Sequence, residues 1–346
     1  MLDKTNNKMP PERLLQLDGV EVAFKTRDGL VKAVDGVNYH VDRGEVLGIV
    51  GESGSGKSVT VRAIMRLLAR NAEEGEGEIR FNPDGDTEYR LDGLRRDSRL
   101  MRQLRGGRIG MVFQEPMTAL SPVHSIGTQI MRTVMLHRRV GKEEARARAI
   151  DLLARVQLPQ PERLVDSYPH QLSGGMRQRA MIALALSCDP ALLIADEPTT
   201  ALDVTTEAQI LELLKSLQQE LGMAIVFITH NFGVVADIAD RVAVMYLGRV
   251  VETGLVDDIF YNPQHPYTRA LLGSIPRLGQ KKQRRLSVIK GSVPDPYNIP
   301  SGCVFHTRCD YADPSVCSVR TPPRVAFDRG QEALCHFAGN LPEAGQ

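Results

Sequence analysis

Short apolar runs alternate with stretches of helical spacing along most of this chain. Residues 14–23 and 32–41 have the pattern of two paired strands on either side of the turn-forming Arg27-Asp28-Gly29. Further strand-like runs lie at 45–50, 78–81, 108–113, 191–195, 224–229, 242–246 and 250–252. Helical segments are predicted at 57 to about 68, 176–186 and 204–221. This alternation predicts a largely parallel sheet covered by helices on both faces.

The stretch 125–160 has helical spacing without strands between its segments. Its apolar positions include Ile126, Ile130, Val134, Leu153 and Val156. We interpret this stretch as part of a helical subdomain inserted into the sheet-forming part of the chain.

The composition changes at about residue 255, where prolines become frequent. A basic run follows at 281–285, and four of the five cysteines lie after residue 300. These features predict a separate C-terminal module joined by a flexible linker. With 346 residues, 42% of them hydrophobic, the chain is long enough for one large core and such an appendage.

The charge and hydropathy of the chain limit its environment. The formal net charge of +1 gives no general signal for nucleic-acid binding. We find no apolar run of the roughly 18 residues that a membrane helix needs, and no apolar core of a secretory signal near Met1. We therefore expect a soluble protein of the cytoplasm that reaches a membrane only through partners.

The most specific motif lies directly after the run at 45–50. It reads Gly51-Glu52-Ser53-Gly54-Ser55-Gly56-Lys57-Ser58 and matches G-x-x-x-x-G-K-[ST] in full. Glycines let successive backbone N–H groups face phosphate oxygens at a helix N-terminus. Lys57 is expected to reach the β and γ phosphates of ATP, and Ser58 to offer its hydroxyl to Mg²⁺. A Gly- and Ser-rich surface turn is the alternative.

Polar side chains follow three other predicted strands at the same edge of the sheet. Asp196 ends one strand and is suited to hold Mg²⁺, while Glu197 beside it is suited to act as the base for the attacking water. His230 follows another strand, where it can contact the γ phosphate, and Gln114 follows a third, where its amide can bind both Mg²⁺ and water. Together these residues predict a centre for phosphoryl transfer.

With Leu172-Ser173-Gly174-Gly175 included, residues 14–255 resemble the ATP-binding subunits of ABC transporters. The resemblance implies that Ser173, Gly174 and Gly175 open a helix that caps the γ phosphate of ATP bound to a second subunit. It also implies a D-loop at 201–203 that includes Asp203, a Q-loop at Gln114 and a switch histidine at His230.

Two positions depart from the pattern of that family. Asn231 stands where an aspartate usually follows the switch histidine, which can weaken a contact across the subunit interface. The aromatic residue that stacks on adenine corresponds to Phe24, although the loop at 25–31 is long here.

The resemblance implies an α/β fold of the P-loop NTPase, RecA-like type. Its parallel-sheet core carries an antiparallel β subdomain, an inserted α-helical subdomain and a small Cys-rich C-terminal module. The expected boundaries are an N-terminal tail at 1–13, the nucleotide-binding domain at 14–255, its helical subdomain at about 115–190, and the C-terminal region at 256–346.

Within the family, the phrases at 114–122, 168–172, 262–268 and 291–294 resemble the dipeptide and oligopeptide importer branch, whose relatives include nickel importers. This implies an ATP-hydrolysing motor subunit at the cytoplasmic face of the inner membrane. Its expected partners are a second ABC ATPase subunit, identical or a sister, two membrane permeases and an extracytoplasmic solute-binding protein. No nucleic-acid partner is expected.

Cys303, Cys309, Cys317 and Cys335 are candidate metal ligands, because a reducing cytosol disfavours structural disulfides. Their spacing lacks paired C-x2-C knuckles and does not choose between Zn²⁺ and an iron–sulfur cluster. The resemblance to peptide importers implies a [4Fe–4S] cluster, and unliganded cysteines remain the alternative. Cys188 is interpreted as a core residue.

Two other classes of function fit the motifs less well. A soluble ABC ATPase that acts on DNA, ribosomes or cluster assembly would be expected to carry coiled-coil insertions or a second cassette, and this chain has neither. An exporter subunit is disfavoured by the C-terminal tail and by the lack of a fused membrane domain. The arginines between 90 and 108 are interpreted as a solvated face rather than a nucleic-acid or lipid site.

Overall fold

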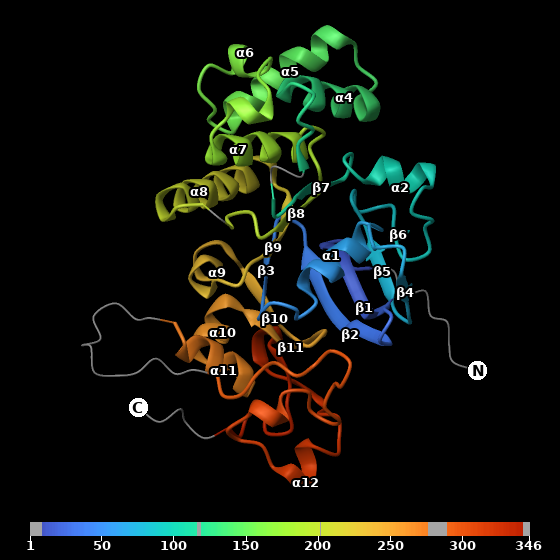
Figure 1. Ribbon diagram of the computed structural model, residues 1–346, viewed down its shortest axis with the longest axis vertical. Coiled ribbons are helices and arrows are strands. Elements are labelled where there is room, and N and C mark those ends of the chain that lie inside the picture. Colours follow the sequence, from blue (N-terminus) through green and yellow to red (C-terminus); the bar gives the residue numbers. More distant parts are fainter. Residues whose placement is uncertain (1–8, 116–118, 201, 276–288, 342–346) are drawn as a thin grey trace.

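Two β-sheets lie side by side in the middle of the molecule, and a group of helices lies at one end of its long axis (Figure 1). The structure is a computed structural model, and it describes residues 9–115, 119–200, 202–275 and 289–341. Residues 1–8 of the expected N-terminal tail, residues 116–118 of the phrase at 114–122, Ala201 of the expected D-loop and the basic run at 281–285 lie outside these described residues.

The larger sheet forms the centre of the molecule. In the described part of the chain it has eight strands in the order β12-β13-β11-β10-β3-β9-β8-β7. The five that pair in parallel are β10 (Arg241–Tyr246), β3 (Val46–Val50), β9 (Ala224–Ile228), β8 (Leu192–Asp196) and β7 (Ile109–Val112). Their carboxyl ends therefore lie along one edge of the sheet, as the sequence predicts.

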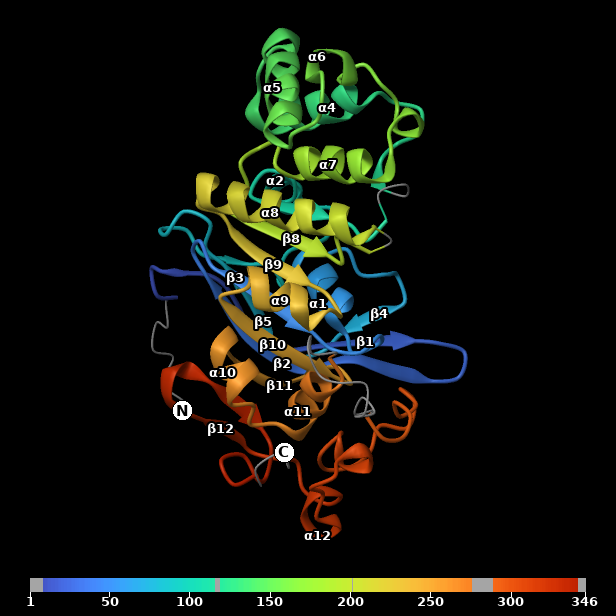
Figure 2. The same cartoon turned by 90° about the vertical axis from the view of Figure 1, so that its left-hand side faces the viewer.

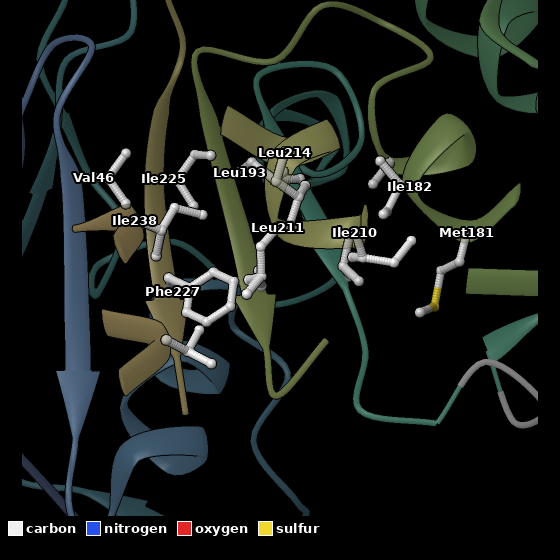
Figure 3. Close-up of a cluster of buried hydrophobic side chains, with 14 of the residues drawn as sticks. Val46, Met181, Ile182, Leu193, Ile210, Leu211, Leu214, Ile225, Phe227 and Ile238 are labelled. Carbon is white, nitrogen blue, oxygen red and sulfur yellow. The ribbon is translucent and has the colours of Figure 1, made fainter. Parts of the chain in front are cut away.

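Helices cover both faces of this sheet (Figure 2), so its central strands are apolar throughout. Every residue of β3, β8 and β9 is buried. On one face, α8 (Val204–Leu221) places Leu211 and Leu214 against Leu193 of β8 and Phe227 of β9 (Figure 3). The other face packs against α1 (Lys57–Ile64) and the smaller sheet. These two clusters hold the strand ends in fixed positions.

The smaller sheet is antiparallel. Its order is β2-β1-β5-β6, and β4 also pairs with β1. The two long strands, β1 (Arg13–Lys25) and β2 (Leu30–Asp42), are the hairpin that the alternating pattern predicts. The shorter strands are β4 (Ala72–Glu74), β5 (Glu78–Phe81) and β6 (Tyr89–Arg90), followed by the helix α2 (Arg99–Leu104).

The helical subdomain lies at the end of the molecule opposite the C-terminal segment (Figure 1). It consists of α4 (Ile126–Arg138), α5 (Lys142–Arg155), α6 (Pro161–Leu164) and α7 (Gly174–Ala185). Ser173 caps α7, because its side chain accepts a hydrogen bond from the backbone N–H of Met176.

The C-terminal segment, residues 289–341, is attached to the larger sheet. Strand β11 (Arg249–Leu255) pairs with β10 on one side and with β13 (Glu332–Leu334) on the other, and β12 (Arg324–Ala326) pairs with β13. The helices α10 (Val256–Tyr261), α11 (Pro266–Gly273) and α12 (Pro314–Cys317) complete this end of the molecule. The change of composition predicts a separate module here, whereas in the structure two strands of this segment, β12 and β13, extend the central sheet.

Two local features differ from the sequence-based expectations or add to them. Helix α1 ends at Ile64 rather than near 68, because Arg66 takes a left-handed conformation with φ of 53°. The remaining helix of the central layer is α9 (Phe232–Ile238), which follows β9. Over the described residues, none of the helices combines the length and the apolar character needed to cross a lipid bilayer.

Candidate nucleotide-binding site

The glycine-rich loop connects β3 to α1 at the carboxyl edge of the larger sheet. Gly51 and Gly56 have φ angles of 152° and 98°. A Cβ at Gly51 would lie 2.1 Å from the carbonyl oxygen of Met245, and one at Gly56 would lie 2.3 Å from that of Ala33. Both positions therefore require glycine, and the backbone of the loop is held in one conformation by the strands beside it.

Lys57, the first residue of α1, is held inside this loop. Its side chain is 5% exposed, and Nζ donates hydrogen bonds to the carbonyl oxygens of Gly51 at 2.7 Å and Glu52 at 3.0 Å. Burial lowers the pKa of Lys57, and the carboxylates of Glu197, Asp196 and Glu52 oppose that shift. The ammonium group thus lies where the loop can present it to an anion.

Ser58 and Asp196 meet across the gap between α1 and β8. Ser58 Oγ donates a hydrogen bond to Asp196 Oδ1 at 2.8 Å. Burial raises the pKa of Asp196, while the hydrogen bond from Ser58 and the nearby charge of Arg62 lower it. A hydroxyl and a carboxylate oxygen side by side are suitable oxygen ligands for Mg²⁺.

Glu197 lies at the centre of the remaining strand-end residues. Gln114 Nε2 donates to Glu197 Oε2 at 3.0 Å, and Thr200 Oγ1 donates to the same oxygen at 3.1 Å. His230 Nδ1 lies 3.7 Å from Glu197 Oε1, and its side chain is 67% exposed. The backbone of Glu197 has φ of 47°, an unfavourable conformation for a residue other than glycine. The chain therefore turns out of the extended conformation of β8 directly after Asp196.

These residues surround one open pocket of about 690 Å³. Its lining comprises Ala33, Ser53, Gly54, Ser55, Gly56, Lys57, Ser58, Val59, Gln114, Glu197 and His230. The structure therefore brings together the glycine-rich loop, Gln114, Glu197 and His230, which the sequence analysis took from four separate strand ends. The combination of a cation, backbone N–H groups and a carboxylate suits a triphosphate and an attacking water.

The other expected site residues lie elsewhere in this chain. Phe24 is half-buried against the cluster between the two sheets and is not part of the pocket lining. Ser173 and Gly174 are exposed at the start of α7, outside the pocket, and Gly175 follows them. Asp203 is the exposed N-cap of α8, where its carboxylate accepts hydrogen bonds from the backbone N–H and the hydroxyl of Thr206. Asn231 likewise caps α9.

Two groups at this site were missed by sequence reasoning. Thr200 contacts Glu197, and Arg308 of the C-terminal segment contacts Glu52 of the glycine-rich loop, with Nη1 to Oε2 at 2.6 Å. The position of Thr200 three residues after Glu197 was an available signal. No sequence signal connects Arg308 with Glu52, because 256 positions separate them.

The four C-terminal cysteines line one small cavity, together with His265, His306 and His336. All four thiols are free, and burial raises the pKa of Cys309 to about 12 and that of Cys335 to about 11. Over the described residues, no three His, Cys, Asp or Glu side chains are arranged to hold a metal ion. This arrangement therefore gives no support to a site for a single ion such as Zn²⁺, and it does not show the [4Fe–4S] cluster that the resemblance implies. The cavity does gather four sulfur donors.

A parallel sheet with this loop between β3 and α1 defines the class of P-loop ATPases. Within that class, the chain belongs to the ABC transporter family, whose model matches residues 34–200. A second model, the oligopeptide/dipeptide transporter C-terminal region, matches residues 251–317. The fold expected from the resemblance is confirmed in its α/β architecture.

Similar proteins of known name cover nearly the whole chain. The oligopeptide transport ATP-binding protein OppD of Bacillus subtilis is 51% identical over 87% of this chain and 82% of its own. The dipeptide transport ATP-binding protein DppD of Escherichia coli is 46% identical over 96% of this chain and 98% of its own. A dimeric post-hydrolysis structure of the ATP-binding cassette MJ0796 with ADP and phosphate matches with a TM-score of 0.61 and 31% identity, over 70% of this chain and 99% of that one.

Proposed function

We propose that this protein is the ATP-hydrolysing motor subunit of an importer that takes up peptides or a related small solute. The match of residues 251–317 to the C-terminal region of oligopeptide and dipeptide transporters carries this proposal, because it extends the likeness beyond the cassette that all ABC ATPases share. The names of the relatives in Bacillus subtilis and Escherichia coli support the same class of solute.

Each residue around the pocket has a proposed part in the reaction. Lys57 and the backbone N–H groups of residues 51–58 bind the phosphates, and Ser58, Asp196 and Gln114 provide oxygen ligands for Mg²⁺. Bound Mg²⁺ would supply charge neutralisation at the phosphates. Glu197 orients and deprotonates the attacking water, and His230 donates to the γ phosphate.

The second half of the proposed site comes from another subunit. Ser173, Gly174 and Gly175 lie outside the pocket of their own chain and at an exposed helix N-terminus, which favours an anion. We place them against the γ phosphate bound by the partner ATPase, with Asp203 at the same interface, and Phe24 beside the adenine. ATP would then close two subunits on each other.

Membrane permease partners and dimerisation follow from membership of this family of ATPases. We further propose two permeases, an extracytoplasmic solute-binding protein and a position at the cytoplasmic face of the inner membrane. Co-purification with the products of neighbouring permease genes, followed by ATP-dependent uptake into vesicles, tests the whole assembly. Uptake of peptides supports the proposal; uptake of nickel but not peptides, or association with repair or ribosomal proteins, contradicts it.

We also propose that Cys303, Cys309, Cys317 and Cys335 bind a [4Fe–4S] cluster. The four thiols line one cavity, and a cluster with several iron atoms binds each thiolate at a different iron, so the sulfurs need not converge on one point. The cluster would brace a segment with little core of its own. Iron, sulfide and zinc are measured in anaerobically purified protein: stoichiometric zinc would favour the alternative metal, and the absence of all three would end the ligand assignment.

A further inference from the structure

Arg308 of the C-terminal segment is buried against the glycine-rich loop. Its side chain is 4% exposed, and its guanidinium forms two hydrogen bonds to the Glu52 carboxylate, from Nη1 to Oε2 at 2.6 Å and from Nη2 to Oε1 at 3.1 Å. This two-bond geometry fixes the direction of the carboxylate as well as its distance. The pair joins a residue close to the C-terminus to the second residue of the loop that surrounds the phosphate site.

Two further contacts hold the guanidinium of Arg308. Nε donates to the carbonyl oxygen of Lys290 at 3.1 Å, and Nη1 lies 3.3 Å from the hydroxyl of Tyr246. The guanidinium carbon lies 5.7 Å from the centre of the Tyr246 ring. A guanidinium with this many fixed partners has little freedom to follow a moving loop, so it serves as a rigid support.

An aromatic cluster surrounds the pair and holds the same loop by its backbone. The rings of Tyr246, Tyr267 and Phe305 contact one another with centres 4.6 to 5.2 Å apart. The hydroxyl of Tyr267 accepts a hydrogen bond from the backbone N–H of Glu52 at 2.9 Å. Both the side chain and the backbone of Glu52 are therefore held by groups outside the loop.

Glu52 in turn contacts the lysine of the phosphate site. Its carbonyl oxygen accepts a hydrogen bond from Lys57 Nζ at 3.0 Å. A shift of Glu52 would move one of the two carbonyl groups that position this ammonium, and it would turn neighbouring N–H groups away from the phosphates. The contacts form a continuous series from Arg308 through Glu52 to Lys57.

We propose that Arg308 is a positioning residue for ATP binding, which acts through its ion pair with Glu52 to hold the glycine-rich loop in its phosphate-binding conformation. The C-terminal segment is thereby a structural part of the nucleotide site and not only an appendage. This inference rests on the proposed role of residues 51–58 in binding ATP. Neither Arg308 nor the Glu52 carboxylate lies in the pocket lining, so both act only through the position of the loop. We therefore expect their loss to weaken the affinity for MgATP rather than to lower kcat.

The test compares R308M, E52Q and the double variant R308M/E52Q in ATP binding and in hydrolysis by the permease complex. Each single variant is expected to raise the Kd and KM for MgATP about tenfold, with kcat within about twofold of the unaltered protein. The double variant is expected to bind MgATP with the same affinity as either single variant, because both changes remove the same interaction.

R329M is the matched control. Arg329 also joins the C-terminal segment to the rest of the chain, through a 3.0 Å ion pair with Asp258. Its partner lies in α10, whereas the partner of Arg308 lies in the glycine-rich loop. This variant should bind ATP with unchanged affinity. E52Q keeps the packing of Arg308 intact, so it remains informative even if R308M fails to fold.

Three outcomes would overturn the inference. They are unchanged affinity in a folded E52Q, a double variant whose loss equals the two single losses multiplied together, and an equal loss of affinity in R329M. Failure of the unaltered protein to bind MgATP would instead contradict the proposed nucleotide site itself. The two proposals are therefore tested separately.

Discussion

The amide of Gln114 donates a hydrogen bond to the carboxylate of Glu197 at 3.0 Å, and this contact joins the ends of β7 and β8. The two residues are far apart in sequence and adjacent in the sheet, because β7 pairs in parallel with β8. The link matters because Gln114 begins the connection towards the helical subdomain, while Glu197 is the proposed base. A change at one residue can therefore be transmitted to the other.

Glu197→Gln is expected to keep ATP binding and to lose turnover by about 10² to 10⁴-fold, because an amide cannot accept the proton of the attacking water. The amide oxygen can still accept from Gln114 and Thr200, which both contact Oε2, so the site should keep its shape. Size-exclusion chromatography with ATP should show a trapped dimer. Thr200→Val is the control, since it removes one hydrogen-bond donor to Glu197 but leaves the carboxylate in place. If Glu197→Gln hydrolyses ATP as fast as the unaltered protein, Glu197 is not the base.

Lys57→Ala is expected to weaken MgATP binding about tenfold to a hundredfold, the usual effect of losing a charged hydrogen-bond donor. The carbonyl groups of Gly51, which is buried, and Glu52, which is half-buried, would also lose their partner, so the melting temperature should fall. Equilibrium binding of a fluorescent ATP analogue measures the first effect. Lys215→Ala on α8 removes an exposed lysine and should change neither the MgATP affinity nor the melting temperature. If Lys57→Ala and Lys215→Ala bind MgATP with equal affinity, Lys57 is not part of the site.

Ser173→Arg should leave ATP binding to the isolated chain unchanged, because Ser173 does not line its own pocket. ATP-dependent dimerisation and turnover should be lost, since a large cation would occupy the proposed contact with the partner's γ phosphate. Ser125→Ala is the matched control: Ser125 caps α4 as Ser173 caps α7, each by accepting from a backbone N–H at 3.3 Å. Both variants lose a cap, which costs about 1 kcal/mol, but only Ser173→Arg should stop turnover. Normal turnover in Ser173→Arg would contradict the two-subunit site.

Glu252 provides a prediction for the pH dependence of stability. It is fully buried on β11, where its carboxylate accepts from the backbone N–H groups of Gln264 and His265 and from Gln331 Nε2. Burial raises its pKa from the usual 4.5 to about 7. Between these values the folded protein binds more protons than the unfolded chain, so the contribution of Glu252 to stability falls as the pH rises, by up to about 1.4 kcal/mol per pH unit.

Glu252→Gln removes this titration and is the reference for the measurement. The melting temperature of the unaltered protein, minus that of Glu252→Gln, should decrease from pH 5 to about pH 7 and then level off. A difference that stays constant or increases over this range would show that Glu252 is ionised throughout.

Much of the fold could be predicted from the sequence because its signals are local. The helix α8 begins and ends at the residues expected from the apolar spacing, and β5 does so too. The glycine-rich loop lies between a buried strand and a helix, as its motif requires. The early end of α1 at Ile64 was not predictable, because the left-handed conformation of Arg66 is imposed by its surroundings rather than by its own preference.

The candidate site was predicted less completely. Strand ends located Gln114, Glu197 and His230, which line the pocket, and Asp196, which contacts Ser58 of its lining, because parallel strands bring their carboxyl ends to one edge. The conformation of Glu197 and its contact with Thr200 came only from the structure. The resemblance placed Phe24 at the adenine, whereas in this chain it packs half-buried against the core between the sheets.

By itself, the sequence determined the order of strands and helices and the chemistry of the phosphate loop, because apolar periodicity and glycine spacing act over a few neighbouring residues. The tertiary structure alone decided that β13 joins the central sheet beside β11 and that Arg308 supports Glu52. Contacts between residues far apart in the sequence depend on how the whole molecule packs. The residues next to Arg308 in the sequence carry no pattern that predicts its pairing with Glu52.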